Sequence, residues 1–396
     1  MSNTLFVSPF GEFNLQRLPK VDRDPLQAWD AADSLLLQTL SDQNIQIESP
    51  LICNDPFGAI TVALNSFTPT SWSDSRISHS ALRKNLVLNK LDQNSVHILE
   101  SMSEPKVAPK LVLIKLPKTL GLLEDQLIRL KPLLNAESKV FVAGMVKHMP
   151  SSVWKLLERL VGPTATGLAV KKAKVIEVTV DMDMTAVSNP YPVRWKLENT
   201  ELELISHANV FSRDKLDIGT RFMLEHLPVT EGQGDIIDLG CGNGVLALMS
   251  ALQNPQAHIH CVDESYMAIA SAQQNFKQLE SISPSAERQV HFHASNGMGT
   301  FTHNSADLVL CNPPFHQNQS VGDALAKSMF RESEQVLRPG GELWVVGNRH
   351  LGYHQRLRQF FDRITQVAFN QKFVILKATK SLIDEGQIEP AQKLPD

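Results

Sequence analysis

The chain has 396 residues, of which 42% are hydrophobic and 20% charged, and its formal net charge is −4. This length allows two domains of ordinary size, and the weak net charge provides no overall basic field for binding a polyanion. No apolar run approaches the length of a membrane span, and the N-terminus lacks the apolar core of a secretory signal, so we expect neither membrane insertion nor export.

Four cysteines are scattered through the chain and form no Cys-x-x-Cys pair. This pattern favours reduced thiols in a cytoplasmic protein over a disulfide framework or a metal-binding site. We therefore expect a cytoplasmic location and no metal cofactor.

In chain order, the first half of the sequence reads as alternating strands and helices. An apolar strand at 51–53 leads through Gly58 into a helix, and a second helix is expected at 81–86. Apolar strands follow within 110–118 and at 139–143. Alternation of this kind predicts an α/β domain.

Three lysines near the end of this first region, Lys171, Lys172 and Lys174, form the densest basic cluster. Charges are nearly balanced up to residue 200 and net acidic beyond it, so RNA binding would have to use such a local patch. An ordinary solvated surface cluster is the alternative interpretation. Sparser basic clusters occur at Lys147-His148 and at Arg83-Lys84 with Lys90.

The polar segment 183–193 contains two prolines and is the expected linker to a second domain. A strand is predicted at 200–205 and a helix at 221–227. Between them, the loop from Phe211 to Thr220 could cover a ligand pocket, although Gly-Thr is equally typical of a helix start.

Three glycines, Gly240, Gly242 and Gly244, connect an apolar strand to an apolar helix within residues 235–248. Glycine permits a tight turn there and lets backbone N–H groups approach a ligand at the helix N-terminus. A dinucleotide-binding turn would need its last glycine where Val245 stands. The Asp-x-Gly-x-Gly-x-Gly form instead resembles the S-adenosylmethionine loop of the class I methyltransferases.

Two further polar residues stand at the ends of the next predicted strands. The strand at 258–262 ends at Asp263, whose carboxylate can accept hydrogen bonds from two ribose hydroxyls. A third short strand at 290–293 ends close to Asn296. The order of these features makes a methyl-donor site the best interpretation.

The tetrapeptide Asn312-Pro313-Pro314-Phe315 follows an apolar strand at 307–311. It suits the methylation of an exocyclic amine, which is a poor nucleophile because its lone pair is drawn into the ring of the base. The Asn312 side-chain carbonyl and the Pro313 backbone carbonyl can accept hydrogen bonds from such an amine and direct its lone pair at a methyl donor. Phe315 offers a face on which a base can stack. The alternative is a Pro-rich turn with one apolar anchor.

The pattern after Phe315 completes a seven-stranded sheet, and the tail beyond Lys380 is polar. Alternating helices and strands again predict an α/β domain. The predicted elements are a helix at 324–337, a turn at 338–341, a strand at 342–346, a helix at 354–361 and a hairpin of 364–369 with 373–378.

The first half resembles a degenerate copy of the second half, which indicates an internal duplication at a period of about 190 residues. Residues 51–64 align with residues 235–248 without gaps, and this alignment places Gly58 on Gly242. Apolar strands and helices then follow in the same order in both copies.

The first copy lacks the groups that catalysis needs. In this alignment Pro56 and Phe57 replace the first glycine and its neighbour, which blocks approach of the backbone to the donor. Lys115 stands in the place of Asn312 and offers only hydrogen-bond donors where the amine needs an acceptor. This copy either binds the substrate or only supports the second domain.

Four segments together resemble the bacterial ribosomal RNA guanine-N2 methyltransferases: Phe211–Ser212 with Leu216–Thr220, Asp238–Gly244, Val262–Ser265 and Asn312–His316. The segment Pro25–Asp33, together with Asn312–His316, is most similar to the corresponding segments of the large-subunit (23S) enzyme. The resemblance implies an α/β fold of two class I, Rossmann-like, seven-stranded methyltransferase domains in tandem, the N-terminal one degenerate. It also implies S-adenosylmethionine as the methyl donor and ribosomal RNA as the partner, 23S more than 16S.

The resemblance assigns roles to individual residues. Those implied to bind the donor are Asp238, Gly240, Gly242, Gly244, Asp263 and Asn296. Of these, Asp263 takes the ribose and Asn296 the adenine. Catalysis is assigned to Asn312, Pro313 and Phe315, acting on a guanine flipped out of its stack. Those that would contact the substrate are Phe211, His316, Lys171, Lys172 and Lys174.

The implied domains are a degenerate domain at 1–182, a linker at 183–193, a catalytic domain at 194–380 and a polar tail at 381–396. Three alternatives remain open. A guanine-N2 or adenine-N6 methyltransferase of 16S RNA would use a similar tetrapeptide, and so would a methyltransferase of glutamine side chains. The non-enzymatic alternative is a donor-binding pseudo-enzyme that assists ribosome assembly.

Overall fold

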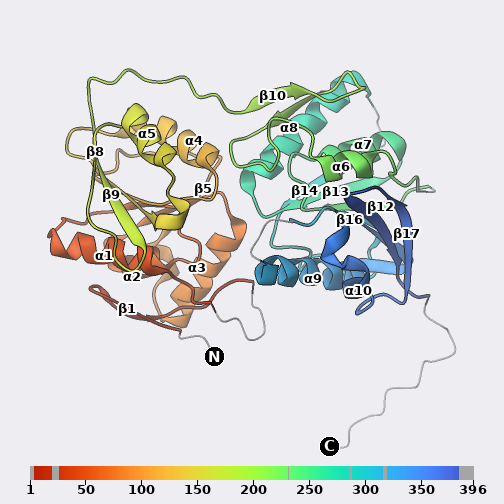
Figure 1. Cartoon of the computed structure of the whole chain (residues 1–396), viewed down its shortest axis with the longest axis horizontal. Coiled ribbons are helices and arrows are strands. Elements are labelled where there is room, and N and C mark those ends of the chain that lie inside the picture. Colours follow the sequence, from red (N-terminus) through yellow and green to blue (C-terminus); the bar gives the residue numbers. More distant parts are fainter. Residues whose placement is uncertain (1–3, 20–25, 231, 285–287, 315–318, 383–396) are drawn as a thin grey trace, which may run out of the picture. The chain divides into compact units, whose positions relative to one another are not determined.

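The computed structural model describes residues 4–19, 26–230, 232–284, 288–314 and 319–382 of the chain (Figure 1). These residues form two seven-stranded sheets joined by helices, together with two small hairpins. The predicted fold class, two seven-stranded α/β domains in tandem, is confirmed.

The chain divides into two compact units. Unit 1 comprises Met1–Lys215, Asp263–Gln278 and Ala294–Asn296. Unit 2 comprises Leu216–Val262, Leu279–His293 and Gly297–Asp396. The domain boundaries predicted at residues 182, 193 and 380 stay a prediction, and residues 383–396 of the predicted tail lie outside the described residues.

The first sheet is parallel except for β9 (Ala173–Thr179), which pairs antiparallel with both of its neighbours. Its strands in spatial order are β5 (His97–Glu100), β4 (Thr70–Ser73), β3 (Leu51–Cys53), β6 (Leu111–Lys115), β7 (Lys139–Met145), β9 (Ala173–Thr179) and β8 (Thr164–Thr166). The central strands β3 and β6 are buried along their whole length, as expected where helices cover both faces of a parallel sheet.

The helices of the first half are α1 (Ala31–Asp42), α2 (Ala59–Ala63), α3 (Arg76–Leu88), α4 (Leu120–Leu130) and α5 (Ser151–Leu160). Helix α1 begins with a capping box, in which Asp30 accepts the N–H of Ala32 and Asp33 accepts the N–H of Asp30. A hairpin of β1 (Leu5–Ser8) and β2 (Gly11–Asn14) precedes it. Neither α1 nor this hairpin was predicted.

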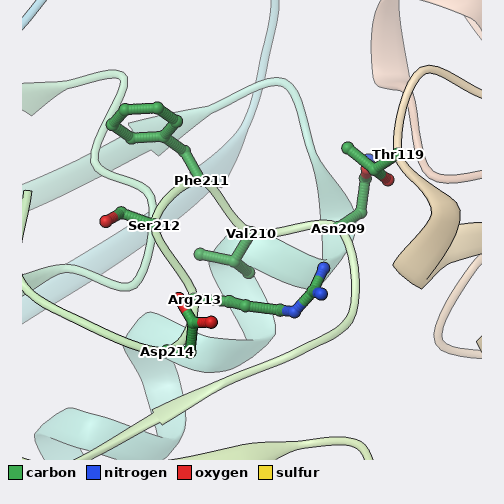
Figure 2. A pocket seen from close by; sticks show the side chains of 7 residues that line it. All are labelled: Thr119, Asn209, Val210, Phe211, Ser212, Arg213 and Asp214. Carbon is green, nitrogen blue, oxygen red and sulfur yellow. The ribbon is translucent and has the colours of Figure 1, made fainter.

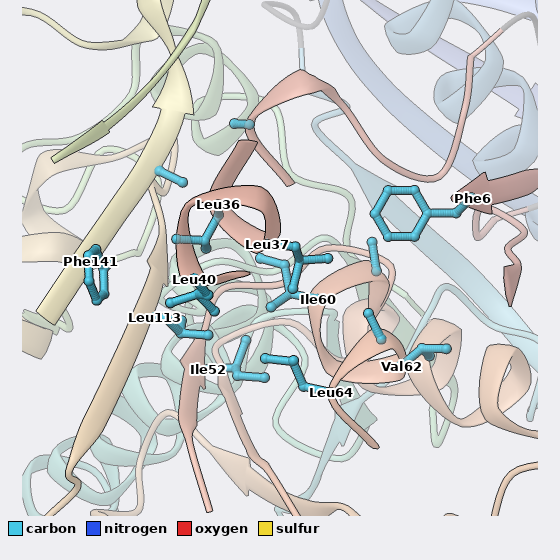
Figure 3. Packing of buried hydrophobic residues seen from close by; sticks show 14 of the residues in the cluster. Phe6, Leu36, Leu37, Leu40, Ile52, Ile60, Val62, Leu64, Leu113 and Phe141 are labelled. Atoms are coloured by element: carbon cyan, nitrogen blue, oxygen red, sulfur yellow. The ribbon is translucent and has the colours of Figure 1, made fainter. Parts of the chain in front are cut away.

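Alternate residues of the central strands point to opposite faces of the first sheet and pack into two separate cores. Ile52, Leu113 and Phe141 pack with residues of α1 and α2 (Figure 3). Their neighbours Val112 and Val140 pack with residues of α4 and α5. Successive side chains of a strand point to opposite faces of the sheet. A strand that is covered by helices on both faces therefore needs an apolar residue at every position.

The second sheet combines parallel strands with a closing antiparallel hairpin, as predicted. Its strands in spatial order are β14 (Gln289–Ala294), β13 (His258–Asp263), β12 (Asp235–Leu239), β15 (Ala306–Cys311), β16 (Leu337–Asn348), β18 (Phe373–Thr379) and β17 (Arg363–Phe369). The helices of this half are α6 (Ile218–Leu224), α7 (Val245–Gln253), α8 (Tyr266–Ile282), α9 (Gln319–Val336) and α10 (Tyr353–Leu357).

Shorter elements connect the larger ones. A second hairpin consists of β10 (Val193–Lys196) and β11 (Glu203–Ser206). The short 3₁₀ helices are η1 (Asn65–Phe67), η2 (Gln93–Ser95), η3 (Lys131–Leu133), η4 (Val146–His148) and η5 (Arg349–Leu351). Most of the predicted linker has no regular structure, and β10 begins at its last residue.

Three predicted elements differ from the structure. The helix expected at 221–227 begins earlier, because the Asp217 carboxylate caps α6 by accepting the backbone N–H of Thr220. The turn expected at 338–341 belongs to β16, and the helix expected at 354–361 is the shorter α10.

Both sheets have the same strand order, which agrees with the predicted duplication. Counted in chain order from β3 and from β12, each sheet runs 3-2-1-4-5-7-6. The two halves therefore share their connections as well as their elements.

The gapless alignment of the two copies is wrong by two residues. Gly58 precedes α2 with a φ of 80°, and Gly244 precedes α7 with a φ of 79°, so Gly58 matches Gly244 and not Gly242. A shift of two residues leaves the inward and outward alternation of a strand unchanged, and the apolar pattern therefore cannot reveal the error. Pro56 consequently occupies the position of Gly242.

Candidate active site

The carboxyl ends of β12 and β15 bring two predicted motifs together at one edge of the second sheet. The strands are parallel neighbours, and Leu239 pairs with Cys311, each being the last residue of its strand. Gly240 and Asn312 therefore leave the sheet side by side. The crevice outside the carboxyl ends of parallel strands is where open α/β sheets bind ligands.

The glycine loop has the backbone conformation that its sequence predicts. Gly240, Gly242 and Gly244 have φ angles of 77°, 55° and 79°, in the left-handed region that glycine adopts without strain. The N–H groups of Gly240 and Cys241 donate to the carbonyl of Val262 at 2.8 and 3.0 Å, which fixes the loop to β13. A Cβ atom added to Gly242 would meet no described atom within 4 Å, so this backbone faces open space.

Asp238 supports the glycine loop from within the protein. Its side chain is buried, and one carboxylate oxygen accepts the backbone N–H of Ala247 at 3.0 Å. This hydrogen bond holds the first turn of α7, which starts directly after Gly244. Its assignment to donor binding stays a prediction, and the contact with α7 gives it a positioning role.

Asp263 and Asn296 stand at strand ends, as predicted. Asp263 is the half-buried last residue of β13, and its Oδ1 accepts the N–H of Ser265 at 2.9 Å. Asn296 follows the end of β14 and is exposed. Their roles at the ribose and the adenine stay predictions.

Two residues at the start of α6 hold the side chain of Asn312. Its Nδ2 donates to Oδ2 of Asp217 at 3.2 Å and to Oγ1 of Thr220 at 2.9 Å. Its Oδ1 is shielded from solvent and has no hydrogen-bond donor among the described residues. Pro313 is buried, whereas Phe315 and His316 lie outside the described residues, so their assigned roles stay predictions.

Asp217 and Thr220 were not predicted as site residues. Their spacing is typical of a capped helix start, and that signal explains their local structure completely. They meet Asn312 across 95 and 92 residues of chain. Only the folding of the sheet brings them together, so the local sequence could not have predicted their contact with Asn312.

Phe211 lies in the loop between β11 and α6, and its side chain is 62% exposed. Loop residues 209–214, with Thr119, line a hollow of about 320 Å³ in unit 1 (Figure 2). Figure 2 shows the ring of Phe211 turned away from the side chains of Val210 and Arg213. An exposed ring of this kind is available for stacking on a base, and the predicted substrate contact stays a prediction.

Lys171 and Lys172 form the two-residue turn between β8 and β9. The flanking residues are Val170 and Ala173. The N–H of Val170 donates to the carbonyl of Ala173 at 3.0 Å, and the N–H of Ala173 donates to the carbonyl of Val170 at 2.8 Å. Both lysines are exposed, and their φ angles are 47° and 64°. Two left-handed residues make a type I′ turn, which favours Asn-Gly and strains lysine. Lys174 follows in β9, with its Nζ 5.9 Å from the ring centre of Trp154.

Lys115 occupies the position in the first sheet that is equivalent to Asn312, and it forms a buried ion pair. Lys115 follows the residue of β6 that pairs with the end of β3, as Asn312 follows the corresponding residue of β15. Its Nζ lies 2.7 Å from Oδ1 of Asp30 and 2.5 Å from Oδ1 of Asp33. Burial raises the pKa of Asp33 to about 6 and also raises that of Asp55, although Lys115 acts in the opposite direction. Lys115 itself offers only hydrogen-bond donors where a substrate amine needs an acceptor.

The described residues contain no group of three or more His, Cys, Asp or Glu side chains placed to hold a metal ion. Within the same part of the chain, no helix is both long and apolar enough to cross a bilayer. All four cysteines are buried free thiols. The site described above consists of backbone groups, amides, carboxylates and the Thr220 hydroxyl.

Known proteins resemble both halves of the chain. Residues 3–182 match the RLMG N-terminal domain, and residues 201–377 match the methyltransferase small domain. The "Ribosomal RNA large subunit methyltransferase G" of Pseudomonas paraeruginosa is 50% identical over 379 residues, which cover 95% of this chain and 100% of the relative. The protein of that name from Pseudomonas fluorescens is 48% identical with the same coverage. The chain belongs to the ribosomal RNA large subunit methyltransferase G family.

This membership confirms the resemblance to large-subunit enzymes that the motifs predict. A solved structure, the T. thermophilus 16S rRNA N2 G1207 methyltransferase in complex with AdoMet and guanosine, matches with a TM-score of 0.73 and 20% identity. The match covers 95% of this chain and 97% of the other. At this identity the likeness shows the fold, so the family member shares its tandem methyltransferase architecture.

Proposed function

We propose that this family member transfers a methyl group from S-adenosylmethionine to the exocyclic N2 amine of a guanine in 23S ribosomal RNA. The observation that carries the proposal is the position of Asn312 beside the glycine loop, at the carboxyl ends of neighbouring parallel strands. The large-subunit names of the relatives favour 23S over 16S RNA. Because bacterial ribosomes are made in the cytoplasm, we place the protein there, which fits its buried free thiols.

Asn312 and Pro313 prepare the amine for attack. The N2 lone pair of guanine is delocalised into the ring, so the amine is a weak nucleophile. Oδ1 of Asn312 and the carbonyl oxygen of Pro313 each accept an N–H, which favours a tetrahedral nitrogen with its lone pair directed at the donor. When bound, S-adenosylmethionine supplies an electrophilic methyl group on a cationic sulfur. The attacking nitrogen becomes acidic enough to lose its proton to water, so no dedicated base is required.

The glycine loop is the proposed holder of the donor. Its backbone faces open space at Gly242, and the loop leads directly into the N-terminus of α7, where the helix dipole favours a negative charge. Asp263 is assigned to the ribose hydroxyls and Asn296 to the adenine. This arrangement needs glycine for close approach, and that need explains why the first copy, with Pro56 at the equivalent position, has no such site.

A guanine inside an RNA helix presents its amine only to the groove, so the target base is proposed to flip out of its stack. Phe315 is the proposed stacking partner of the flipped base. Phe211, with its exposed ring, and His316 are proposed as further substrate contacts. Stacking on an aromatic ring accepts any base, so the hydrogen bonds of Asn312 and Pro313 have to select the amine.

The N-terminal domain, residues 1–182, is proposed to bind RNA through the lysine turn. The three lysines form the densest basic cluster of the chain, and Lys171 and Lys172 are exposed at the tip of a turn. Residues 183–193 then serve as the linker, residues 194–380 as the catalytic domain and residues 381–396 as a polar tail. Lys174 is the third proposed contact of this patch.

Replacing the lysine turn by its preferred sequence is expected to separate stability from RNA binding. The double variant Lys171→Asn/Lys172→Gly relieves two strained φ angles. Its free energy of unfolding should therefore rise by about 1 kcal/mol or more, and it should unfold at a higher temperature. It also loses two positive charges, so its affinity for 23S RNA should fall, and by a similar factor whatever the base sequence of the RNA. The slope of log K against log salt should decrease by roughly 0.7–0.9 for each lost phosphate contact.

Lys90→Gly is the matched control for the lysine turn. Lys90 is also exposed and has a φ of 58°, so its replacement removes one charge and one strained angle elsewhere in the same domain. Lys90 belongs to one of the sparser basic clusters, and the proposal that RNA contacts the lysine turn instead requires its salt slope to equal that of the wild type. Equal slopes in the double variant and the wild type would show that the lysine turn does not contact RNA.

The activity itself is tested by following the methyl group. The full-length protein is incubated with methyl-labelled S-adenosylmethionine and with 23S RNA, 16S RNA or assembled large subunits, all lacking the modification. Label is expected as N2-methylguanosine in the 23S samples. Label on N6-methyladenosine, on 16S RNA alone or on protein would overturn the proposal, and the absence of label on every substrate would favour the pseudo-enzyme.

A further inference from the structure

The side-chain amide of Asn312 is held only through its nitrogen. Nδ2 donates to Asp217 at 3.2 Å and to Thr220 at 2.9 Å. The Thr220 hydroxyl lies 3.4 Å from Oδ2 of Asp217, to which it can donate its own proton. A carboxylate only accepts hydrogen bonds, so the opposite amide orientation would place two acceptors against each other. The Asp217 carboxylate therefore selects one orientation of the amide.

The other end of the same amide carries an unused acceptor. Oδ1 of Asn312 is shielded from solvent, and among the described residues no donor reaches it. A buried acceptor without a partner is unfavourable, and native structures rarely keep one without a functional reason. In the proposed reaction the missing donor is the exocyclic amine.

The first turn of α6 fits closely against this amide. Oδ2 of Asp217 also accepts the backbone N–H of Thr220 at 2.9 Å, so the helix start fixes the carboxylate. A Cβ atom on Gly219 would lie 3.1 Å from Oδ2 of Asp217 and 3.7 Å from Oδ1 of Asn312. Glycine at this position lets the helix backbone lie beside both groups without crowding them.

We infer that Asp217 and Thr220 are positioning residues, which orient the Asn312 amide so that Oδ1 faces the substrate amine. The inference rests on the proposed function, because it assumes that Asn312 accepts a hydrogen bond from that amine. Neither residue is required to touch the substrate. Their effect on the reaction passes through Asn312 alone.

The first test removes the Thr220 acceptor while keeping the shape of the side chain. Thr220→Val should lower the single-turnover methylation rate roughly tenfold, as expected for one lost hydrogen bond. Thr220→Ser should restore most of the rate, and neither variant should change the affinity for S-adenosylmethionine measured by calorimetry. In the Asn312→Ala background, Thr220→Val should have no further effect. An equal loss in that background would overturn the inference.

The second test changes the carboxylate without removing the helix cap. Asparagine caps helices as well as aspartate does, but it can also donate an N–H to Oδ1 of Asn312. Asp217→Asn should therefore lower the rate roughly tenfold by occupying the acceptor or allowing the amide to turn. Thr230→Val is the control, because Thr230 bonds Oδ1 of Asn254 at 3.1 Å at the far end of α7. This control should keep the wild-type rate.

A readout independent of activity keeps the inference separate from the proposed function. In protein labelled with ¹⁵N-asparagine, the side-chain amide signals of Asn312 are assigned by their loss in Asn312→Ala. They should shift in Thr220→Val and in Asp217→Asn and stay in place in Thr230→Val. Unchanged signals in the first two variants would overturn the inference, whatever substrate is methylated. Total label on RNA measures the rates, and the identity of the labelled nucleoside separately tests the proposed function.

Discussion

Replacing Asn312 by alanine is expected to lower the single-turnover rate by roughly 10²- to 10³-fold, the usual cost of removing a preorganised hydrogen-bonding group from a reacting centre. The physical reason is that the amine loses the acceptor that directs its lone pair. The glycine loop does not contain this residue and is fixed to Val262 by its own backbone. Binding of S-adenosylmethionine should therefore be unchanged.

The measurement uses excess enzyme over 23S RNA, so that product release does not mask the chemical step. Asn304→Ala is the matched control, because Asn304 precedes the same strand β15 at its opposite end and bonds Lys380 at 2.9 Å. It should keep the wild-type rate. A rate for Asn312→Ala within about tenfold of the wild type would show that Asn312 does not hold the amine.

Replacing Lys115 by methionine is expected to destabilise the first sheet by about 3–5 kcal/mol, the typical loss when one partner of a buried ion pair is removed. The variant leaves Asp30 and Asp33 without their cation, and Asp33 is 2% exposed. Hydrogen exchange of the backbone of α1, followed by mass spectrometry, measures the loss as a lower free energy of opening. Peptides from β12 serve as the internal reference.

The pH dependence of this loss has a definite sign. Burial raises the pKa of Asp33 to about 6 from 3.8, so the folded state binds this proton more tightly than the unfolded state does. The contribution of Asp33 to stability is full below pH 3.8 and is lost as the pH rises through about 6. Without Lys115 this pKa rises further. The destabilisation should therefore be larger at about pH 8 than at about pH 5.5.

Lys110→Met is the control at the other end of the same strand. Lys110 also pairs with a carboxylate, Glu48 at 2.7 Å, but both side chains are at least 60% exposed. Exposed pairs contribute about 0–1 kcal/mol, so this variant should change little. Equal losses in the two variants, or a loss in Lys115→Met that grows as the pH falls, would contradict the buried-pair explanation.

The sequence predicted the fold well because its strongest signals are local. Gly240, Gly242 and Gly244 indicate a left-handed turn between a strand and a helix, and the structure has that turn. The register of the duplication was wrong because a slip of two residues preserves the faces of a strand. The repeated glycine before a helix, Gly58 and Gly244, is the signal that would have corrected it.

The candidate site was only partly predictable. Asn312 belongs to a tetrapeptide whose role the upstream glycine loop supports. Asp217 and Thr220 were expected only in a loop that could cover the ligand pocket, and the fold alone shows that they contact Asn312. The strain at Lys171 and Lys172 was also invisible, because only backbone angles show that a dense basic cluster occupies a turn that favours Asn-Gly.

The buried cluster around Lys115 makes the loss of the first site difficult to reverse during evolution. A single change of Lys115 to asparagine would restore the amide but leave Asp33 and Asp55 buried without a cation. A working donor loop would also require replacement of Pro56. The first change alone is expected to destabilise the first sheet, and neither change alone completes a site. The two halves therefore share one topology but carry different groups at this position, a buried ion pair in the first and an amide in the second.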